Sequence, residues 1–100
     1  MAMISQKFKD LVIAKTDMVQ LVSGYIRLES RDGNTWKGLC PFHRDYSGTF
    51  VVSPGKKIFK CFICGKGGDP VRFVMMIEKK GFVEAIGVLA ERAGLRMDET

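Results

Sequence analysis

The residues of this sequence best suited to chemistry are its three cysteines and its single histidine, which form two closely spaced pairs. Cys40 and His43 make the first pair and Cys61 and Cys64 the second, each with two residues between the partners. A gap of two residues lets both side chains of a pair reach the same metal ion. The 17 residues between the pairs are enough for one β-hairpin, which can bring the second pair back to the first.

Three thiolates and one imidazole are a donor set typical of Zn²⁺, which prefers four tetrahedral sulfur and nitrogen ligands. Four protein ligands leave no open position for water, so the pattern predicts one structural zinc ion and no catalytic residue. A redox pair at Cys61 and Cys64 is an alternative, but the neighbouring Cys40 and His43 and the lack of a thioredoxin-like βαβ pattern argue against it. A zinc-dependent hydrolase would need an open metal position and a nearby carboxylate base.

The chain has 100 residues, which is room for a single domain, predicted over residues 1–100. A core of this size needs an additional source of stability. An odd number of cysteines argues against a disulfide framework, so a structural zinc ion is the expected source. No apolar run is long enough to span a membrane, and the first residues lack the apolar core of a signal peptide. We therefore expect a cytoplasmic protein with no membrane partner.

The positive charge of the chain is concentrated in the segment that holds both pairs. The formal net charge is +5, and residues 36–72 account for all of this excess. Basic patches attract polyanions, and single-stranded nucleic acid is held by cations together with aromatic faces on which bases stack. A solvated lysine-rich surface is the plain alternative. The predicted DNA contacts are the basic and aromatic residues of this segment: Trp36, Lys37, Lys56, Lys57, Phe59, Lys60, Lys66 and Arg72.

Apolar residues at helical spacing predict helices on both sides of this basic segment. Ser5 and Asp17 are expected to cap two helices in the first third of the chain. In the last third, Asp69 is expected to cap a helix that runs to about Lys80, and a final helix is expected to end at Gly94.

Alternating polar and apolar residues between these helices predict four short strands. Turn signals at Asp32-Gly33 and Pro54-Gly55 join them into two hairpins of one antiparallel sheet, and Gly67-Gly68 are expected to end it. The predicted fold class is α+β, with a zinc ribbon on a small antiparallel β-sheet that is flanked by N- and C-terminal helices.

Four stretches around the two pairs resemble the N-terminal zinc-binding domain of bacterial DnaG-type DNA primases. They are GLCPFH at 38–43, FVVSP at 50–54, FKCFICG at 59–65 and GGD at 67–69, and the resemblance covers about residues 8–96. It implies that the domain contacts single-stranded template DNA and helps to choose the trinucleotide at which a primer starts. It also implies that a separate polymerase domain of the Toprim type makes the RNA primer. The matching motif places the four metal ligands at Cys40, His43, Cys61 and Cys64.

This chain is not expected to be an enzyme by itself, because its acidic residues are scattered and nucleotidyl transfer needs carboxylates clustered around Mg²⁺. Residues 95–100 are predicted to begin a linker to a polymerase domain. The partners that the resemblance implies are the template strand, the polymerase domain in cis or in trans, and a replicative helicase bound through the rest of the primase. The alternative from another class is a zinc-ribbon adaptor that docks on a protein partner without direct nucleic-acid binding.

Overall fold

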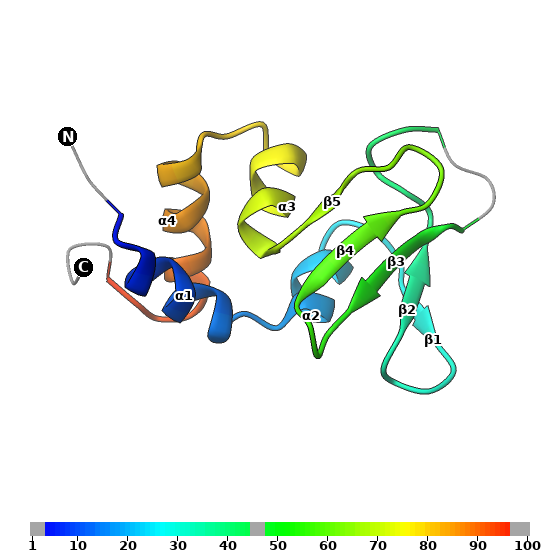
Figure 1. The fold of residues 1–100 in the computed structure, drawn as a ribbon, viewed down its shortest axis with the longest axis horizontal. Helices are drawn as coiled ribbons and strands as arrows, with labels where there is room; N and C mark the ends of the chain where they lie inside the picture. The colour runs from blue at the N-terminus through cyan, green and yellow to red at the C-terminus, as the bar shows by residue number, and fades with distance from the viewer. Residues whose placement is uncertain (1–3, 45–47, 97–100) are drawn as a thin grey trace.

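The computed structural model describes residues 4–44 and 48–96. This part of the chain contains four helices and five strands, in the order α1 (Gln6–Ala14), α2 (Met18–Ser23), β1 (Glu29–Ser30), β2 (Trp36–Gly38), β3 (Phe50–Ser53), β4 (Ile58–Cys61), β5 (Gly67–Gly68), α3 (Pro70–Ile77) and α4 (Phe82–Arg92). The strands pair in sequence order, each antiparallel to its neighbour (Figure 1). The predicted α+β class is confirmed. Within the described ranges, no helix has the length and apolar character needed to cross a membrane.

Three of the helices begin at the cap residues that the sequence indicates. The side chains of Ser5, Asp17 and Asp69 each accept a hydrogen bond from the backbone N–H three residues further on, at 2.8–3.0 Å. Helix α3 is shorter than predicted, since it ends at Ile77 and the chain turns at Lys79, whose φ is 55°. After α4, Leu95 packs against the core, and residues 97–100 of the predicted linker lie outside the described residues.

The sheet has one strand more than predicted, because Gly67 and Gly68 pair with β4 instead of ending the sheet. A Cβ atom at Gly67 would lie only 2.8 Å from the carbonyl oxygen of Phe59. The missing side chain therefore permits this close pairing. Two glycines show no alternation of polar and apolar side chains, which is why the sequence pattern did not indicate a strand here.

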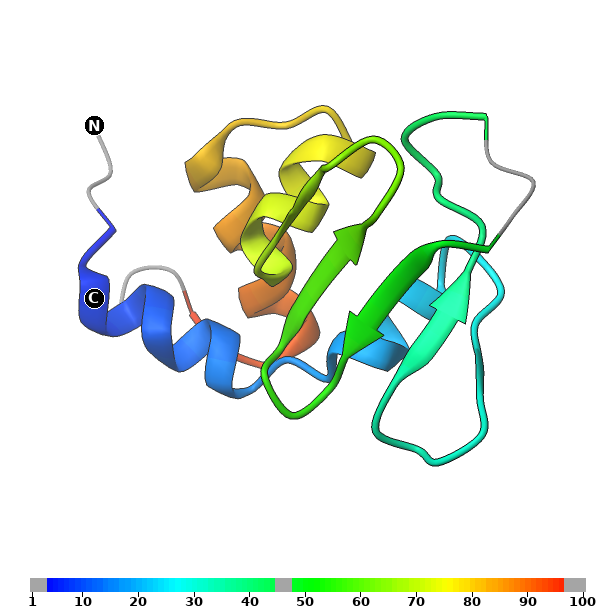
Figure 2. The ribbon, with the colours of Figure 1, turned by 45° about the vertical axis from the view of Figure 1, so that its right-hand side comes forward.

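One face of the sheet packs on helices and the other is open. In Figure 2 the sheet lies in front of α2 and α3, and Figure 1 shows α4 beyond α3, with α1 beside it. The core between sheet and helices includes four phenylalanine rings whose centroids all lie 5.5–6.5 Å from one another: Phe42, Phe50, Phe59 and Phe73. Such ring pairs contribute about 0.5–1.5 kcal/mol each beyond the burial of their area.

Candidate metal centre and open sheet face

Two loops at the same end of the sheet carry the predicted metal ligands. Cys40 and His43 follow β2, Cys61 is the last residue of β4, and Cys64 lies in the turn before β5. The two loops are adjacent because both β2 and β4 pair with β3. The ligand atoms of all four side chains lie within 4.8 Å of one another. The structure thus brings together the two pairs that are separated in the sequence.

The spacing of these atoms fits a tetrahedral zinc ion. With Zn–S bonds of about 2.3 Å, two sulfurs of a tetrahedron lie about 3.8 Å apart, and the Sγ atoms of Cys40 and Cys64 are 3.9 Å apart. Nε2 of His43 lies 3.1 Å from Sγ of Cys61. Nδ1 of the same ring donates to the carbonyl oxygen of Arg44 at 2.9 Å, which directs Nε2 toward the thiols as in metal-bound histidines. The donor set, gathered within 4.8 Å, is consistent with one structural zinc.

The two buried thiols differ in acidity. Burial raises the pKa of Cys40 to about 12. Burial also acts to raise the pKa of Cys61, but the backbone N–H groups of Cys64 and Ile63 donate to its sulfur and the pKa is lowered to about 6. Because the thiolate is the form that binds a metal, Cys61 is ready to coordinate at neutral pH.

The turn that follows Cys61 is fixed by its own backbone. The N–H of Gly65 donates to the carbonyl oxygen of Cys61 at 3.0 Å. The N–H of Cys61 donates to the carbonyl oxygen of Lys66 at 2.8 Å. Gly65 has a φ of 79°, the positive value that its position directly after Cys64 predicts. The turn leaves the two residues between the cysteines, Phe62 and Ile63, 69% and 64% exposed.

Two of the predicted DNA contacts share the open face of the sheet. Lys37 of β2 pairs with Val51 of β3, and Val51 pairs with Lys60 of β4. These three residues therefore form a row across the sheet, on the opposite side from the buried Phe50 and Phe59. Both lysines are exposed. We call this surface the open face.

The two aromatic residues predicted as DNA contacts lie on the other side of the sheet. Phe59 is 1% exposed and belongs to the phenylalanine cluster, so the prediction that its ring contacts DNA is wrong. Trp36 pairs with the buried Val52, packs half-buried against the core, and donates from Nε1 to the carbonyl oxygen of Gly33 at 3.2 Å. Alternation along a strand separates these rings from the lysines that neighbour them in sequence.

The remaining predicted contacts are dispersed. Lys57 lies in the turn before β4, and its Nζ donates to the carbonyl oxygen of Thr16 at 2.6 Å. This lysine therefore joins the turn to the loop between α1 and α2. Lys56 is exposed in the same turn, at the end of the sheet away from the cysteines, and Lys66 is exposed beside β5. Arg72 lies on α3 with its aliphatic stem against Gly68.

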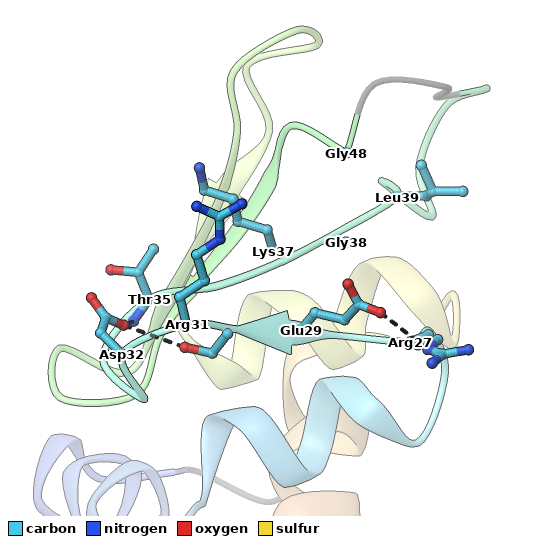
Figure 3. A pocket seen from close by; sticks show the side chains of 10 residues that line it. Arg27, Glu29, Arg31, Asp32, Thr35, Lys37, Gly38, Leu39 and Gly48 are labelled. Atoms are coloured by element: carbon cyan, nitrogen blue, oxygen red, sulfur yellow. Dashed lines mark hydrogen bonds and ion pairs between the residues drawn. The ribbon is translucent and has the colours of Figure 1, made fainter.

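A hollow of about 840 Å³ lies over β1 and β2 (Figure 3). One of the residues that line it is Arg31, a basic residue that was not among the predicted DNA contacts. Arg31 and Lys37 both line it, and no ion pair is recorded for either among the described residues. Two acidic residues also line it. A carboxylate oxygen of Glu29 lies 3.6 Å from Nε of Arg27. Asp32 accepts hydrogen bonds from the backbone N–H groups of Asn34 and Thr35, and these bonds lower the pKa of its carboxyl group. The alternation of charged residues from 27 to 31 was the signal that could have indicated Arg31.

Comparison with known proteins agrees with this geometry. The family model of the CHC2 zinc finger matches residues 4–100. The DNA primase of Treponema pallidum is 46% identical over 97% of this chain, and that of Clostridium acetobutylicum is 42% identical over 96% of it. The chain spans only 16% and 15% of the length of these two relatives.

A solved structure shows the same fold. The crystal structure of the Aquifex aeolicus primase, with its zinc-binding and RNA polymerase domains, matches 97% of this chain and 24% of that chain. The TM-score is 0.82 and the sequence identity is 39%. With its two ligand pairs gathered at one end of a five-stranded sheet, the chain belongs to the CHC2 zinc-finger family, the zinc-binding domain of DnaG-type DNA primases.

Proposed function

We propose that this domain binds single-stranded template DNA on its open face and helps to select the site at which primer synthesis starts. The observation that carries the proposal is the row of Lys37, Val51 and Lys60 across the face that the helices leave uncovered. Arg31 lines the hollow beside Lys37, and Lys66 adjoins the β5 edge. Cations spaced along such a surface can follow the phosphates of a single strand.

The metal centre supports this role by holding the surface in shape. We propose Cys40, His43, Cys61 and Cys64 as the ligands of the zinc ion. Cys61 ends β4, the strand that carries Lys60, and Cys40 comes two residues after the end of β2, the strand that carries Lys37. When bound, the zinc ion supplies a rigid link between the ends of these strands.

We propose that nucleotidyl transfer itself is carried out by another part of the protein. Among the described acidic residues, Asp17 and Asp69 cap helices, Asp32 holds a turn and Glu78 accepts the hydroxyl of Tyr25. Mg²⁺-dependent phosphoryl transfer needs clustered carboxylates instead. The proposed protein partners are accordingly a polymerase domain and, through the rest of the primase, a replicative helicase.

Fluorescence anisotropy of a labelled single strand, titrated with zinc-loaded protein at several salt concentrations, tests the proposal. With about four phosphate contacts, the slope of log affinity against log salt should be near −3. A duplex of the same sequence and a chelator-treated sample should both bind more weakly. A slope near zero would exclude phosphate contacts, and tight binding to an isolated polymerase domain without DNA affinity would favour the adaptor function.

A pair of double variants locates the binding surface. Replacing Lys37 and Lys60 together by glutamine should reduce the magnitude of the slope by about 1.4, since each lost contact removes about 0.7. The matched control replaces Lys7 and Lys15, two exposed lysines of the α1 region, by glutamine. It removes the same two positive charges from a different surface. Equal effects of the two double variants would show that net charge alone attracts DNA and that the open face has no special role.

A further inference from the structure

Two hollows lie along the open face, and they differ in charge. The hollow over β1 and β2 contains both acidic and basic side chains (Figure 3). The second, of about 490 Å³, lies over β3, β4 and β5, and we call it the β3–β5 groove. Lys60 lines this groove, and none of the described residues that line it is acidic. A groove with a cation and no carboxylate is the better match for a polyanionic strand.

An aromatic ring stands at this groove. Phe62 lines it and is 69% exposed, more than any other large apolar residue in the described ranges. It continues the alternation of β4, in which the side chains of Ile58 and Lys60 are exposed while Phe59 and Cys61 are buried. Its backbone N–H donates to the carbonyl oxygen of Thr49 at 3.3 Å. The ring therefore extends from a backbone that is held on both sides, by this hydrogen bond and by the turn of the metal centre.

The charge of Lys60 lies in the same groove. Its Nζ donates to the carbonyl oxygen of Gly65 at 3.2 Å, and Gly65 also lines the groove. Its stem passes beside Gly67, where an added Cβ would lie 3.1 Å from Cδ of Lys60. An ammonium group has three donors, so two are available to a phosphate oxygen. The glycines of β5 add no side chain to the groove, which leaves this edge open to an extended strand.

We propose that Phe62 stacks against one base of the bound single strand while Lys60 contacts a neighbouring phosphate. This inference rests on the proposed function and assigns a base-binding subsite within it. Every base has a face on which an aromatic ring can stack, so the subsite accepts any of the four bases. It favours single strands over duplexes, because both faces of a base inside a duplex are already covered by the stacked neighbouring base pairs.

Anisotropy measurements with two strands of equal length test the role of the ring, one strand carrying normal nucleotides and one carrying abasic sites. The two strands have the same phosphates, so the difference in affinity reports contacts with bases. Phe62→Ala should weaken binding of the normal strand about 5- to 150-fold and leave binding of the abasic strand nearly unchanged. The salt slope should not change, since the phosphate contacts are kept.

Matched variants separate the ring from general effects of the substitution. Ile63→Ala removes a side chain that is 64% exposed in the same turn but does not line the groove, and it should leave both affinities unchanged. Phe62→Trp should retain affinity, and in a Trp36→Phe background its fluorescence should be quenched when the normal strand binds. All variants should bind one equivalent of zinc.

Two results would overturn the stacking subsite: normal affinity of Phe62→Ala for the normal strand, or an equal loss of affinity for both strands. Neither result would affect the proposed function, provided that the wild-type domain binds single strands with the expected salt dependence. Failure of the wild-type domain to bind either strand at low salt would instead refute the proposed function itself.

Discussion

Phe59 and Phe62 lie three residues apart in sequence but on opposite faces of the sheet. Because their surroundings differ, we expect one ring to stabilise the fold and the other to contact a ligand. Phe59 is buried and packs against other rings of the phenylalanine cluster, while Phe62 is exposed beside Lys60. A buried ring stabilises the fold through the contacts of both its faces. An exposed ring contributes little to stability and is free to contact a ligand.

The substitution Phe59→Ala is therefore expected to act on stability. Removal of a buried phenylalanine ring leaves a cavity and lowers the free energy of unfolding by about 3–5 kcal/mol. Guanidinium denaturation of the zinc-loaded domain measures this loss, with Phe62→Ala as the control that should shift the unfolding midpoint little. A midpoint for Phe59→Ala equal to that of the wild type would contradict the burial of this ring.

The cluster of metal-ligating side chains could be predicted from the sequence, whereas the face of the sheet that each basic or aromatic residue occupies could be predicted only in part. The local spacing within each pair indicates the ligands Cys40, His43, Cys61 and Cys64. The fold then only has to bring the two pairs together. The alternation along β4 does assign neighbouring residues to opposite faces, but it does not say which face the helices cover. That depends on the packing of α2 and α3, which buries Phe59 and leaves Phe62, a residue that the sequence did not single out, exposed.

At the scale of elements, one polar contact joins the end of α2 to the end of α3. The hydroxyl of Tyr25 donates to a carboxylate oxygen of Glu78 at 2.6 Å, and its ring meets the edge of Phe73 with centroids 5.6 Å apart. The hydrogen bond to Glu78, with a smaller contribution from burial, raises the pKa of Tyr25 above its ordinary value of 10.0. The protonated tyrosine is thus the form that the folded state favours.

The sign of this shift makes the contribution of Tyr25 depend on pH. Tyr25→Phe keeps the ring but removes the hydrogen bond, and it should lower the free energy of unfolding by about 1 kcal/mol at neutral pH. The raised pKa means that the stabilisation is complete below about pH 10 and is lost as the pH rises through the folded-state value. Urea denaturation of both proteins from pH 7 to 11 tests this. A difference that grows with pH would contradict the donor role of the hydroxyl.

The elements with strong local signals are those that the sequence predicted best. Ser5, Asp17 and Asp69 satisfy N–H groups within their own first turn, so their effect needs no tertiary contact. Strand β5 depends instead on its partner, since Gly67 and Gly68 have no side chains to mark a strand and pair only because β4 lies alongside. The hydrogen bond of Lys57 likewise depends on the fold, because the carbonyl that its ammonium group contacts lies 41 residues away in sequence.

At the scale of the whole molecule, the metal centre and the apolar core are one structure. Cys40 and Cys61 are both buried in the core cluster, and the ring of Phe42, between Cys40 and His43, packs on Phe50, Phe59 and Phe73. The rings on the sheet side of this cluster are covered by α2 and α3. Disruption of the zinc site is therefore transmitted directly to the contacts between sheet and helices.

Removal of zinc should accordingly unfold sheet and helices in a single transition. Structural zinc sites in small peptides contribute on the order of 10–16 kcal/mol at neutral pH, as much as the total stability of about 5–15 kcal/mol of most domains. Chelator treatment and the Cys61→Ser substitution should both abolish cooperative thermal unfolding by circular dichroism, and Zn²⁺, but not Mg²⁺, should restore it in the chelated protein. Helical signal that survives chelation with its own sharp transition would show that α1 and α4 fold independently of the metal. Retention of one tightly bound zinc by Cys61→Ser would instead refute the ligand assignment, because a serine hydroxyl is a poor substitute for the thiolate that zinc binds.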